Sequence, residues 1–283
     1  MSIKEITIVI TSFNSDEKIN SCLHSIDSDC KVVLVENSNN TEFKKKIEKD
    51  FPNVECTLTG ENLGYGKANN IGLKKVETKF ALILNPDTKL HKSTLKNLIN
   101  CTNKISDFAI IGPSIQEEEN EKEIEKTRDA TLISVENIKG YAMFLNLSEF
   151  KEVGFFDERF FIYFEEIDLC LRLKNNGKKI YLAPDVKIYH LGGQSHNRSI
   201  NKEMELSRNW HWMWSTFNYH KKHKGFFISL IIIMPKLISA LFKVLIYSLF
   251  FQKEKKDIYY QRLSGLINAI IGKNSWYRPK IKN

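Results

Sequence analysis

The sequence predicts an α/β domain, a mostly parallel, Rossmann-like sheet with helices on both faces, followed by a basic amphipathic helical tail. Short apolar runs rich in β-branched residues alternate with helix-type repeats from Ile6 to Ile111, as expected for such a sheet. From about Ile200 this alternation gives way to aromatic and basic residues and one long apolar run. We therefore expect one domain over residues 1–199 and a second region over residues 200–283.

The predicted strands follow one another along the first domain. They are the apolar runs 6–10, 32–35, 54–58, 80–84 and 108–111, with later strands expected at 139–145, 180–182 and 186–189. Apolar residues at helical spacing separate them, as in Ile19, Cys22, Leu23 and Ile26. In open sheets of this kind, ligands bind at the carboxyl ends of the strands. The polar strand endings 11–14, 36–37 and 85–87 are therefore expected to share one crevice.

Composition narrows the class of protein. The chain has 283 residues, enough for one large domain and an appendage. Its five cysteines lie far apart and form no C-x-x-C pair. They indicate a reducing compartment and argue against a disulfide framework or a zinc knuckle. The N-terminus leads directly into a strand pattern without the layout of a signal peptide, so we expect a cytoplasmic protein.

The tail differs from the rest of the chain in charge. The whole chain carries a net charge of +8, whereas residues 200–283 contain 15 Lys/Arg against 4 Asp/Glu. The apolar run 226–251 is long enough to span a bilayer, but Pro235, Lys236 and Lys243 interrupt it. We expect a helix lying in a membrane interface. Packing in a homodimer interface or against the main domain is the alternative, and the long apolar run argues against nucleic-acid binding.

Two residues at strand ends could bind a metal ion. Asp87 follows a predicted strand in the turn Asn85-Pro86-Asp87-Thr88, where its carboxylate could hold a divalent cation that bridges phosphate oxygens. His190 also ends a predicted strand and could supply an imidazole to the same ion. Each also has a purely structural explanation, because such turns are common and a lone histidine is more often structural.

Three carboxylates follow an aromatic run at the start of a predicted helix. They are Glu165, Glu166 and Asp168, after Phe160 to Phe164. The helix dipole favours acidic residues there, and Asp168 could pair with Arg172 one turn later. A carboxylate among apolar rings and other carboxylates has a raised pKa, which suits a general base. The spacing alone does not decide between a structural role at the helix start and a role as general base.

Taken together and in order, these motifs resemble glycosyltransferase family 2 proteins with the GT-A fold, and most closely a rhamnosyltransferase-like branch that extends lipid-linked bacterial glycans. The matching segments, within residues 5–196, are ITIVITSFN, VEN, ENLGYGKANNIGL, LILNPDT, GYAMFLN, GFFDERFFIYFEEIDLCLRL and YHLGG. The resemblance implies an inverting transfer from a nucleotide-diphosphate sugar, such as dTDP-rhamnose or a UDP-hexose, with Mg²⁺ or Mn²⁺. The implied acceptor is a glycan hydroxyl, linked to polyprenyl diphosphate, in bacterial surface polysaccharide synthesis. The enzyme would be peripheral on the inner face of the cell membrane.

The resemblance also assigns roles to residues. The positions that hold the nucleotide base and ribose are matched by Thr11, Ser12, Asn14 and Glu36. The turn near the donor is matched by Asn62, Gly64 and Asn69. Asp87 matches the metal-binding carboxylate, with Asn85 where the family often has another Asp, and His190 matches a histidine of the metal–diphosphate site. Glu166 matches the second acid of a Glu-Asp pair, the catalytic base, with Asp168 and Glu165 as supports.

Two departures from the family pattern affect the prediction. Glu36 replaces the commoner Asp at the base-binding position, so the sequence does not distinguish uracil from thymine. Glu166 replaces the usual Asp at the catalytic position, which leaves open a share for Glu165 or Asp168. The rival hypotheses are a sugar nucleotidyltransferase, for which the basic glycine-rich N-terminal loop is missing, and a non-catalytic membrane-associated protein that binds nucleotide sugars.

Overall fold

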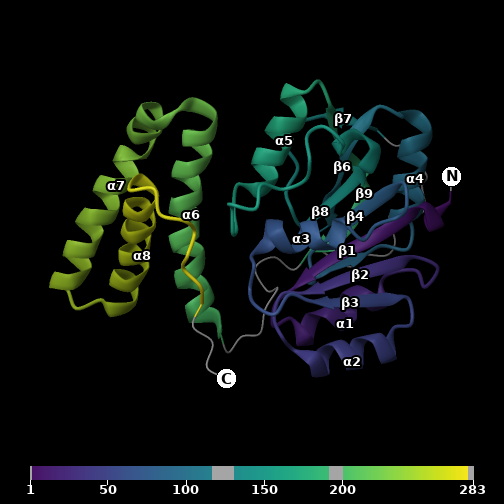
Figure 1. The fold of residues 1–283 in the computed structure, drawn as a ribbon, viewed down its shortest axis with the longest axis horizontal. Helices are drawn as coiled ribbons and strands as arrows, with labels where there is room; N and C mark the ends of the chain where they lie inside the picture. Colours follow the sequence, from purple (N-terminus) through teal and green to yellow (C-terminus); the bar gives the residue numbers. More distant parts are fainter. Residues whose placement is uncertain (1, 117–130, 191–199, 280–283) are drawn as a thin grey trace. The chain divides into compact units, whose positions relative to one another are not determined.

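The computed structural model describes residues 2–116, 131–190 and 200–279. These residues form two compact units (Figure 1). The sheet unit consists of the described residues up to Phe156 together with those from Glu166 to His190. The helical unit consists of the segment Asp157–Glu165 and the described residues from 200 onward. The aromatic run that precedes the three carboxylates therefore belongs with the C-terminal helices.

The sheet unit is built on one mixed sheet, with strand order β3-β2-β1-β4-β8-β6-β9-β5 and the short strand β7 paired to β9. Strands β1 to β4 are parallel, and β8 then runs antiparallel between β4 and β6. The bounds are β1 Ile6–Ser12, β2 Lys31–Glu36, β3 Val54–Leu58, β4 Phe80–Leu84, β5 Thr88–Leu90, β6 Phe108–Gln116, β7 Ile133–Ser134, β8 Ala142–Asn146 and β9 Lys179–His190. The predicted α/β class is confirmed. The two strands expected at 180–182 and 186–189 are one strand, β9.

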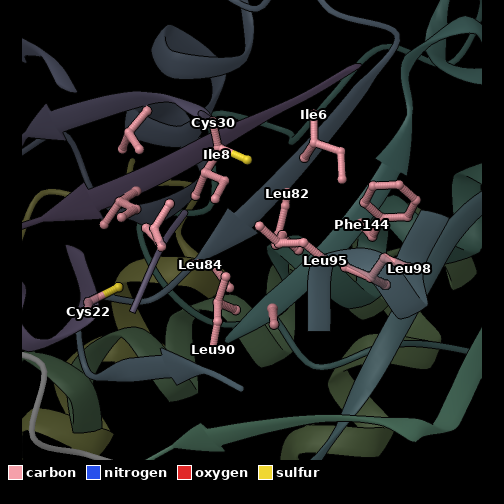
Figure 2. Packing of buried hydrophobic residues seen from close by; sticks show 14 of the residues in the cluster. Ile6, Ile8, Cys22, Cys30, Leu82, Leu84, Leu90, Leu95, Leu98 and Phe144 are labelled. Atoms are coloured by element: carbon pink, nitrogen blue, oxygen red, sulfur yellow. The ribbon is translucent and has the colours of Figure 1, made fainter. Parts of the chain in front are cut away.

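Helices cover both faces of this sheet. They are α1 Asp16–His24, α2 Thr41–Asp50, α3 Tyr65–Leu73, α4 Thr94–Lys104 and α5 Glu165–Asn175. Successive side chains of a strand point to opposite faces, so Ile8 and Leu82 pack with α1, α2 and α4, whereas Val9 and Ile83 pack with α3 and α5. Figure 2 shows the first of these two cores, where Cys22 of α1 and Leu95 and Leu98 of α4 approach the strand side chains.

The helical unit is a bundle of α6 Asn201–Lys224, α7 Phe226–Leu249 and α8 Lys253–Ile270 (Figure 1). Its core contains Trp210, Trp214 and Phe217 of α6, with Leu266 of α8. Gly265 allows α8 to lie against α6, since a Cβ at this position would be 2.3 Å from the carbonyl oxygen of Trp210. The predicted helical tail is confirmed, and two of its four tryptophans, Trp210 and Trp214, are internal.

The segment Asp157–Glu165 packs along α6. Ser215 Oγ donates a hydrogen bond to the carbonyl oxygen of Ile162 (3.0 Å), and Lys222 Nζ lies 2.7 Å from the carboxylate of Asp157. Phe160 is buried in the core of the bundle. These contacts hold the segment in place up to the first residue of α5.

Helix α7 has one side in the bundle and one exposed side. Ser229, Ile233 and Ala240 are buried, and Lys243 Nζ donates to the hydroxyl of Tyr259 on α8 (3.0 Å). The exposed side is apolar and includes Phe227, Ile231, Ile238, Phe242 and Leu249. Within the described residues, α7 is the one helix that is long and apolar enough to cross a membrane.

Candidate functional site

Glu36 organises a hydrogen-bonded cluster at the ends of β1 and β2. The parallel register places it beside Ser12, whose Oγ donates to its carboxylate. Ser38 Oγ donates to the other oxygen (2.7 Å), and the backbone N–H of Asn14 also points to the carboxylate. Burial raises the pKa of Glu36, against the opposing effect of these donors. The cluster brings Ser12, Asn14 and Glu36 together, with Thr11 next to them at the end of β1.

A glycine turn adjoins this cluster. Gly64 precedes α3 with φ of 85°, a backbone conformation that side chains rarely adopt. The amide of Asn37, the residue after Glu36, donates to Asn62 Oδ1 (3.0 Å) and to the carbonyl oxygen of Gly64 (3.2 Å). Asn69 is fully buried on α3. The turn is thus attached to the end of β2, so Asn62 and Gly64 lie near Glu36, while Asn69 Nδ2 donates to the carbonyl oxygen of Tyr65 at the start of α3 (3.0 Å).

Strand register brings Asp87 and His190 together. Thr88 at the start of β5 pairs with His190 at the end of β9. His190 Nε2 consequently lies 3.4 Å from Asp87 Oδ1. The ring of Tyr141 stacks on the imidazole, with centroids 4.9 Å apart, and the carbonyl oxygen of Tyr141 accepts from the N–H of Asn85 (2.9 Å). The two sequence-predicted metal ligands are therefore neighbours on a rigid support.

Several polar atoms of the sequence-predicted donor and metal residues are buried without a hydrogen-bond partner among the described residues. They are Thr11 Oγ1, Asn69 Oδ1, both carboxylate oxygens of Asp87 and Nε2 of His190. Burying a polar group without a partner costs free energy, and native proteins contain few such groups. Their concentration at one edge of the sheet indicates that a polar ligand completes their bonding.

The three carboxylates around the start of α5 have different surroundings. Asp168 is fully buried and pairs with Arg172 (2.8 Å), as the spacing had suggested. Arg172 also donates to the carbonyl oxygens of Val153 (2.7 Å) and Phe155. Asp168 therefore holds the loop that precedes the acidic segment. Glu165 is buried at the first position of the helix.

Glu166 differs from both of its neighbours. Burial raises the pKa of its carboxyl group, although backbone N–H groups at the helix start act in the opposite direction. Its Oε2 is buried and has no hydrogen-bond partner among the described residues. A carboxylate that is easily protonated and is not engaged in an ion pair has the properties of a general base.

The backbone just before these carboxylates is strained. Tyr163 and Phe164 both have φ of 70°, in the left-handed region that non-glycine residues rarely occupy. Such conformations persist where surrounding contacts impose them, and they cluster at functional sites. Here Phe164 packs against Trp212 and Tyr219 of α6. This packing within the helical unit accounts for the strained backbone at Phe164.

Three supporting residues were missed from the sequence. Asn37 fastens the glycine turn, Tyr141 stacks on His190, and Asn70 clasps the backbone of Phe156 through its amide nitrogen (2.9 Å) and oxygen (3.0 Å). Asn37 and Asn70 lie inside the quoted motifs VEN and ENLGYGKANNIGL and could have been singled out as buried amides. The role of Tyr141 depends on strand pairing, which the sequence does not show.

Comparison with known proteins agrees with this geometry. The family described as "Glycosyl transferase family 2" matches residues 7–172. The chain belongs to glycosyltransferase family 2. It is 26% identical over 66% of its length to a low-salt glycan biosynthesis hexosyltransferase of Haloferax volcanii, covering 67% of that protein. It is 22% identical over 59% of its length to an N-acetylglucosaminyl-diphospho-decaprenol L-rhamnosyltransferase of Mycobacterium tuberculosis, covering 68% of that protein.

Solved structures support the same fold. A mannosyltransferase from Pyrobaculum calidifontis, in complex with GDP-Man and Mn²⁺, matches with a TM-score of 0.57 at 11% identity, over 94% of this chain and 87% of that one. The GT-A fold and the rhamnosyltransferase-like branch of the family are thus confirmed. The chain is a glycosyltransferase, so the nucleotidyltransferase hypothesis is set aside.

Proposed function

We propose that this glycosyltransferase moves a sugar from a nucleotide-diphosphate donor, dTDP-rhamnose or a UDP-hexose, to a hydroxyl of a lipid-linked glycan in bacterial surface polysaccharide synthesis. The observation that carries the proposal is a group of buried polar atoms that have no hydrogen-bond partner in the described part of the chain, most of them near the carboxyl ends of the strands. Asp87, His190, Thr11 and Asn69 each present one or more such atoms. A nucleotide with a diphosphate and its counter-ion would satisfy them.

Asp87 and His190 suit a divalent cation. Two ligand atoms about 2.1 Å from one ion, at a right angle, are about 3 Å apart, close to the 3.4 Å between Oδ1 and Nε2. No group of three metal-binding side chains occurs in the described part of the chain, so water and the donor diphosphate would complete the coordination. A Mg²⁺ or Mn²⁺ ion held by Asp87 and His190 would supply positive charge to stabilise a leaving diphosphate.

Glu166 is the proposed base. Its carboxylate would accept the proton of the acceptor hydroxyl as that oxygen attacks the anomeric carbon, and the bond from this carbon to the diphosphate oxygen breaks. A single displacement of this kind inverts the anomeric configuration. Asp168 and Glu165 act as positioning residues, because Asp168 is committed to Arg172 and Glu165 is held at the start of α5.

The name of a relative suggests the acceptor, and the surface of the tail suggests the location of the enzyme. The Mycobacterium tuberculosis relative is named for an acceptor on decaprenyl diphosphate, and α7 exposes an apolar side next to basic residues. We place the enzyme on the cytoplasmic face of the cell membrane, with a polyprenyl-diphosphate-linked glycan as acceptor. A homodimer through the apolar side is the alternative arrangement.

The donor is identified by a panel of nucleotide sugars assayed with Mg²⁺, Mn²⁺ or EDTA. We expect one donor to be turned over with metal and not with EDTA, and NMR of the product to show an inverted anomeric centre. Asp87→Asn should abolish metal-dependent donor binding, because it removes a charged ligand. Full metal-dependent turnover by Asp87→Asn would contradict the metal assignment.

The base is tested with Glu166→Gln. Loss of a general base reduces transfer by about 10²- to 10⁴-fold, whereas donor binding measured by calorimetry should be retained. Glu158→Gln, in the preceding segment, is the matched control and should transfer normally. Transfer by Glu166→Gln within a few fold of the wild type would refute the assignment.

A further inference from the structure

A basic pocket lies in the helical unit, between the segment Asp157–Glu165 and the C-terminal half of α6. It has a volume of about 200 Å³ and is lined by Arg159, Phe160, Trp214, Asn218, Lys221 and Lys222. None of these residues has a part in the proposed donor site or base. The pocket is therefore a candidate for a separate binding site.

The pocket is positively charged at neutral pH. Arg159 and Lys222 both pair with the carboxylate of Asp157, at 2.6 Å and 2.7 Å. Burial alone would raise the pKa of Asp157, but these two donors hold it well below its usual range, so the carboxylate stays ionised. The lining thus contains three cationic side chains, Arg159, Lys221 and Lys222, two of which share the carboxylate of Asp157. Arginine and lysine side chains converging in this way are typical of phosphate binding.

The pocket continues into an apolar surface. Lys221 Nζ lies 5.8 Å from the ring centroid of Phe226, the first residue of α7. From there the exposed apolar side of α7 runs through Phe227, Ile231 and Ile238 to Leu249. At 1.5 Å per residue this helix of 24 residues is about 36 Å long. A cationic pocket at the head of a long apolar track matches a ligand with an anionic head and a hydrocarbon tail.

We propose that this basic pocket binds the diphosphate of an isoprenoid-linked acceptor, with the isoprenoid chain along the exposed side of α7. The inference rests on the proposed function for the identity of the acceptor, and it assigns the site that recognises its lipid anchor. The segment that forms one wall of the pocket leads along the chain, through Tyr163 and Phe164, to Glu165 and Glu166.

Calorimetry on the full chain in detergent tests the binding step without turnover. We expect farnesyl diphosphate to bind at least about tenfold more tightly than inorganic diphosphate or farnesol, because only farnesyl diphosphate has both an anionic diphosphate and an apolar isoprenoid chain. Lys221→Gln should weaken this binding by about five- to tenfold. Lys224→Gln is the matched control: it removes the same charge from the last turn of α6, outside the pocket lining, and should change binding less than about twofold.

Three results would overturn the proposal. Equal weakening by Lys221→Gln and Lys224→Gln would indicate general attraction to the basic helix end. Inorganic diphosphate binding as tightly as farnesyl diphosphate would indicate an anion site without lipid recognition. Farnesol binding as tightly would show that the pocket charges are not used.

Kinetics separate this proposal from the proposed function. With the lipid-linked acceptor, Lys221→Gln should raise the acceptor KM by about five- to tenfold and leave donor KM and kcat nearly unchanged. An unchanged acceptor KM would refute the pocket assignment while leaving the transferase assignment intact. Lack of donor turnover in the wild type would refute the proposed function, and the calorimetric result would still stand.

Discussion

At the scale of single residues, the two acids of α5 that lie two positions apart do different work. Glu166 has a raised pKa and a buried oxygen that no described residue hydrogen-bonds, whereas Asp168 is fully buried in an ion pair. Replacing Glu166 by glutamine should therefore reduce activity, whereas replacing Asp168 by asparagine should reduce stability.

Glu166→Gln should stabilise the protein at neutral pH. A carboxyl group whose pKa is raised on folding contributes stability below its ordinary value of 4.5, and that contribution is lost as the pH rises through the raised value. Glutamine cannot ionise, so the variant avoids this loss. We expect its melting temperature to equal that of the wild type near pH 4 and to exceed it at pH 8. A lower melting temperature at pH 8 would contradict the role of burial.

Asp168→Asn should destabilise the protein and leave donor binding nearly unchanged. Breaking a buried ion pair leaves a charge without its partner and costs about 3 kcal/mol, somewhat less here because Arg172 is 20% exposed. The expected result is a large fall in the free energy of urea unfolding. Donor binding at temperatures where the variant is folded should be close to that of the wild type. Asp107→Asn, at an exposed ion pair with Lys179, is the control and should change the free energy of unfolding far less, because water screens an exposed pair.

At the scale of secondary-structure elements, close packing of α6 and α8 holds the helical unit together. The approach depends on Gly265, which faces the backbone of Trp210, and on the hydrogen bond from Trp210 Nε1 to Ser264 Oγ (3.2 Å). Because the lining of the basic pocket comes partly from α6, this packing also maintains the pocket.

Gly265→Ala should destabilise the helical unit. The added methyl group would overlap a carbonyl oxygen that cannot move without shifting α6, at a cost of about 1 to 3 kcal/mol. We expect faster limited proteolysis within residues 200–279, while nucleotide binding by the sheet unit is retained. Gly272→Ala, which meets no atom within 4 Å but has φ of 77°, controls for backbone strain alone. Equal proteolysis of the two variants would exclude the packing explanation.

At the scale of the whole molecule, α7 exposes a row of large apolar side chains along one side. Phe227, Ile231 and Leu249 are each more than 70% exposed, and contiguous apolar surface of this kind marks an interaction site. Basic residues at the end of α6 and the start of α8 flank it. This arrangement favours an anionic bilayer as the partner.

The combined substitution Phe227→Asp and Ile231→Asp should release the protein from membranes. We expect at least a tenfold loss of binding to vesicles containing phosphatidylglycerol, because two apolar side chains that would enter the bilayer become charged. Stability should change little, since both side chains are exposed. Sedimentation with vesicles measures the first effect and thermal unfolding the second. If the variant binds vesicles normally but changes from dimer to monomer, the apolar side is an interface between copies of the chain.

The sequence by itself determined the α/β class, the family and the positions of the polar strand endings, because strand and helix periodicities and the motifs are local. It also indicated the ion pair of Asp168 with Arg172, which spans a single helical turn. Only the tertiary structure decided that His190 reaches Asp87, through the pairing of β5 with β9, residues about a hundred positions apart. It likewise joined residues 157–165 to α6 to form the basic pocket. Contacts between distant segments depend on register and packing, and no local pattern of residues encodes either.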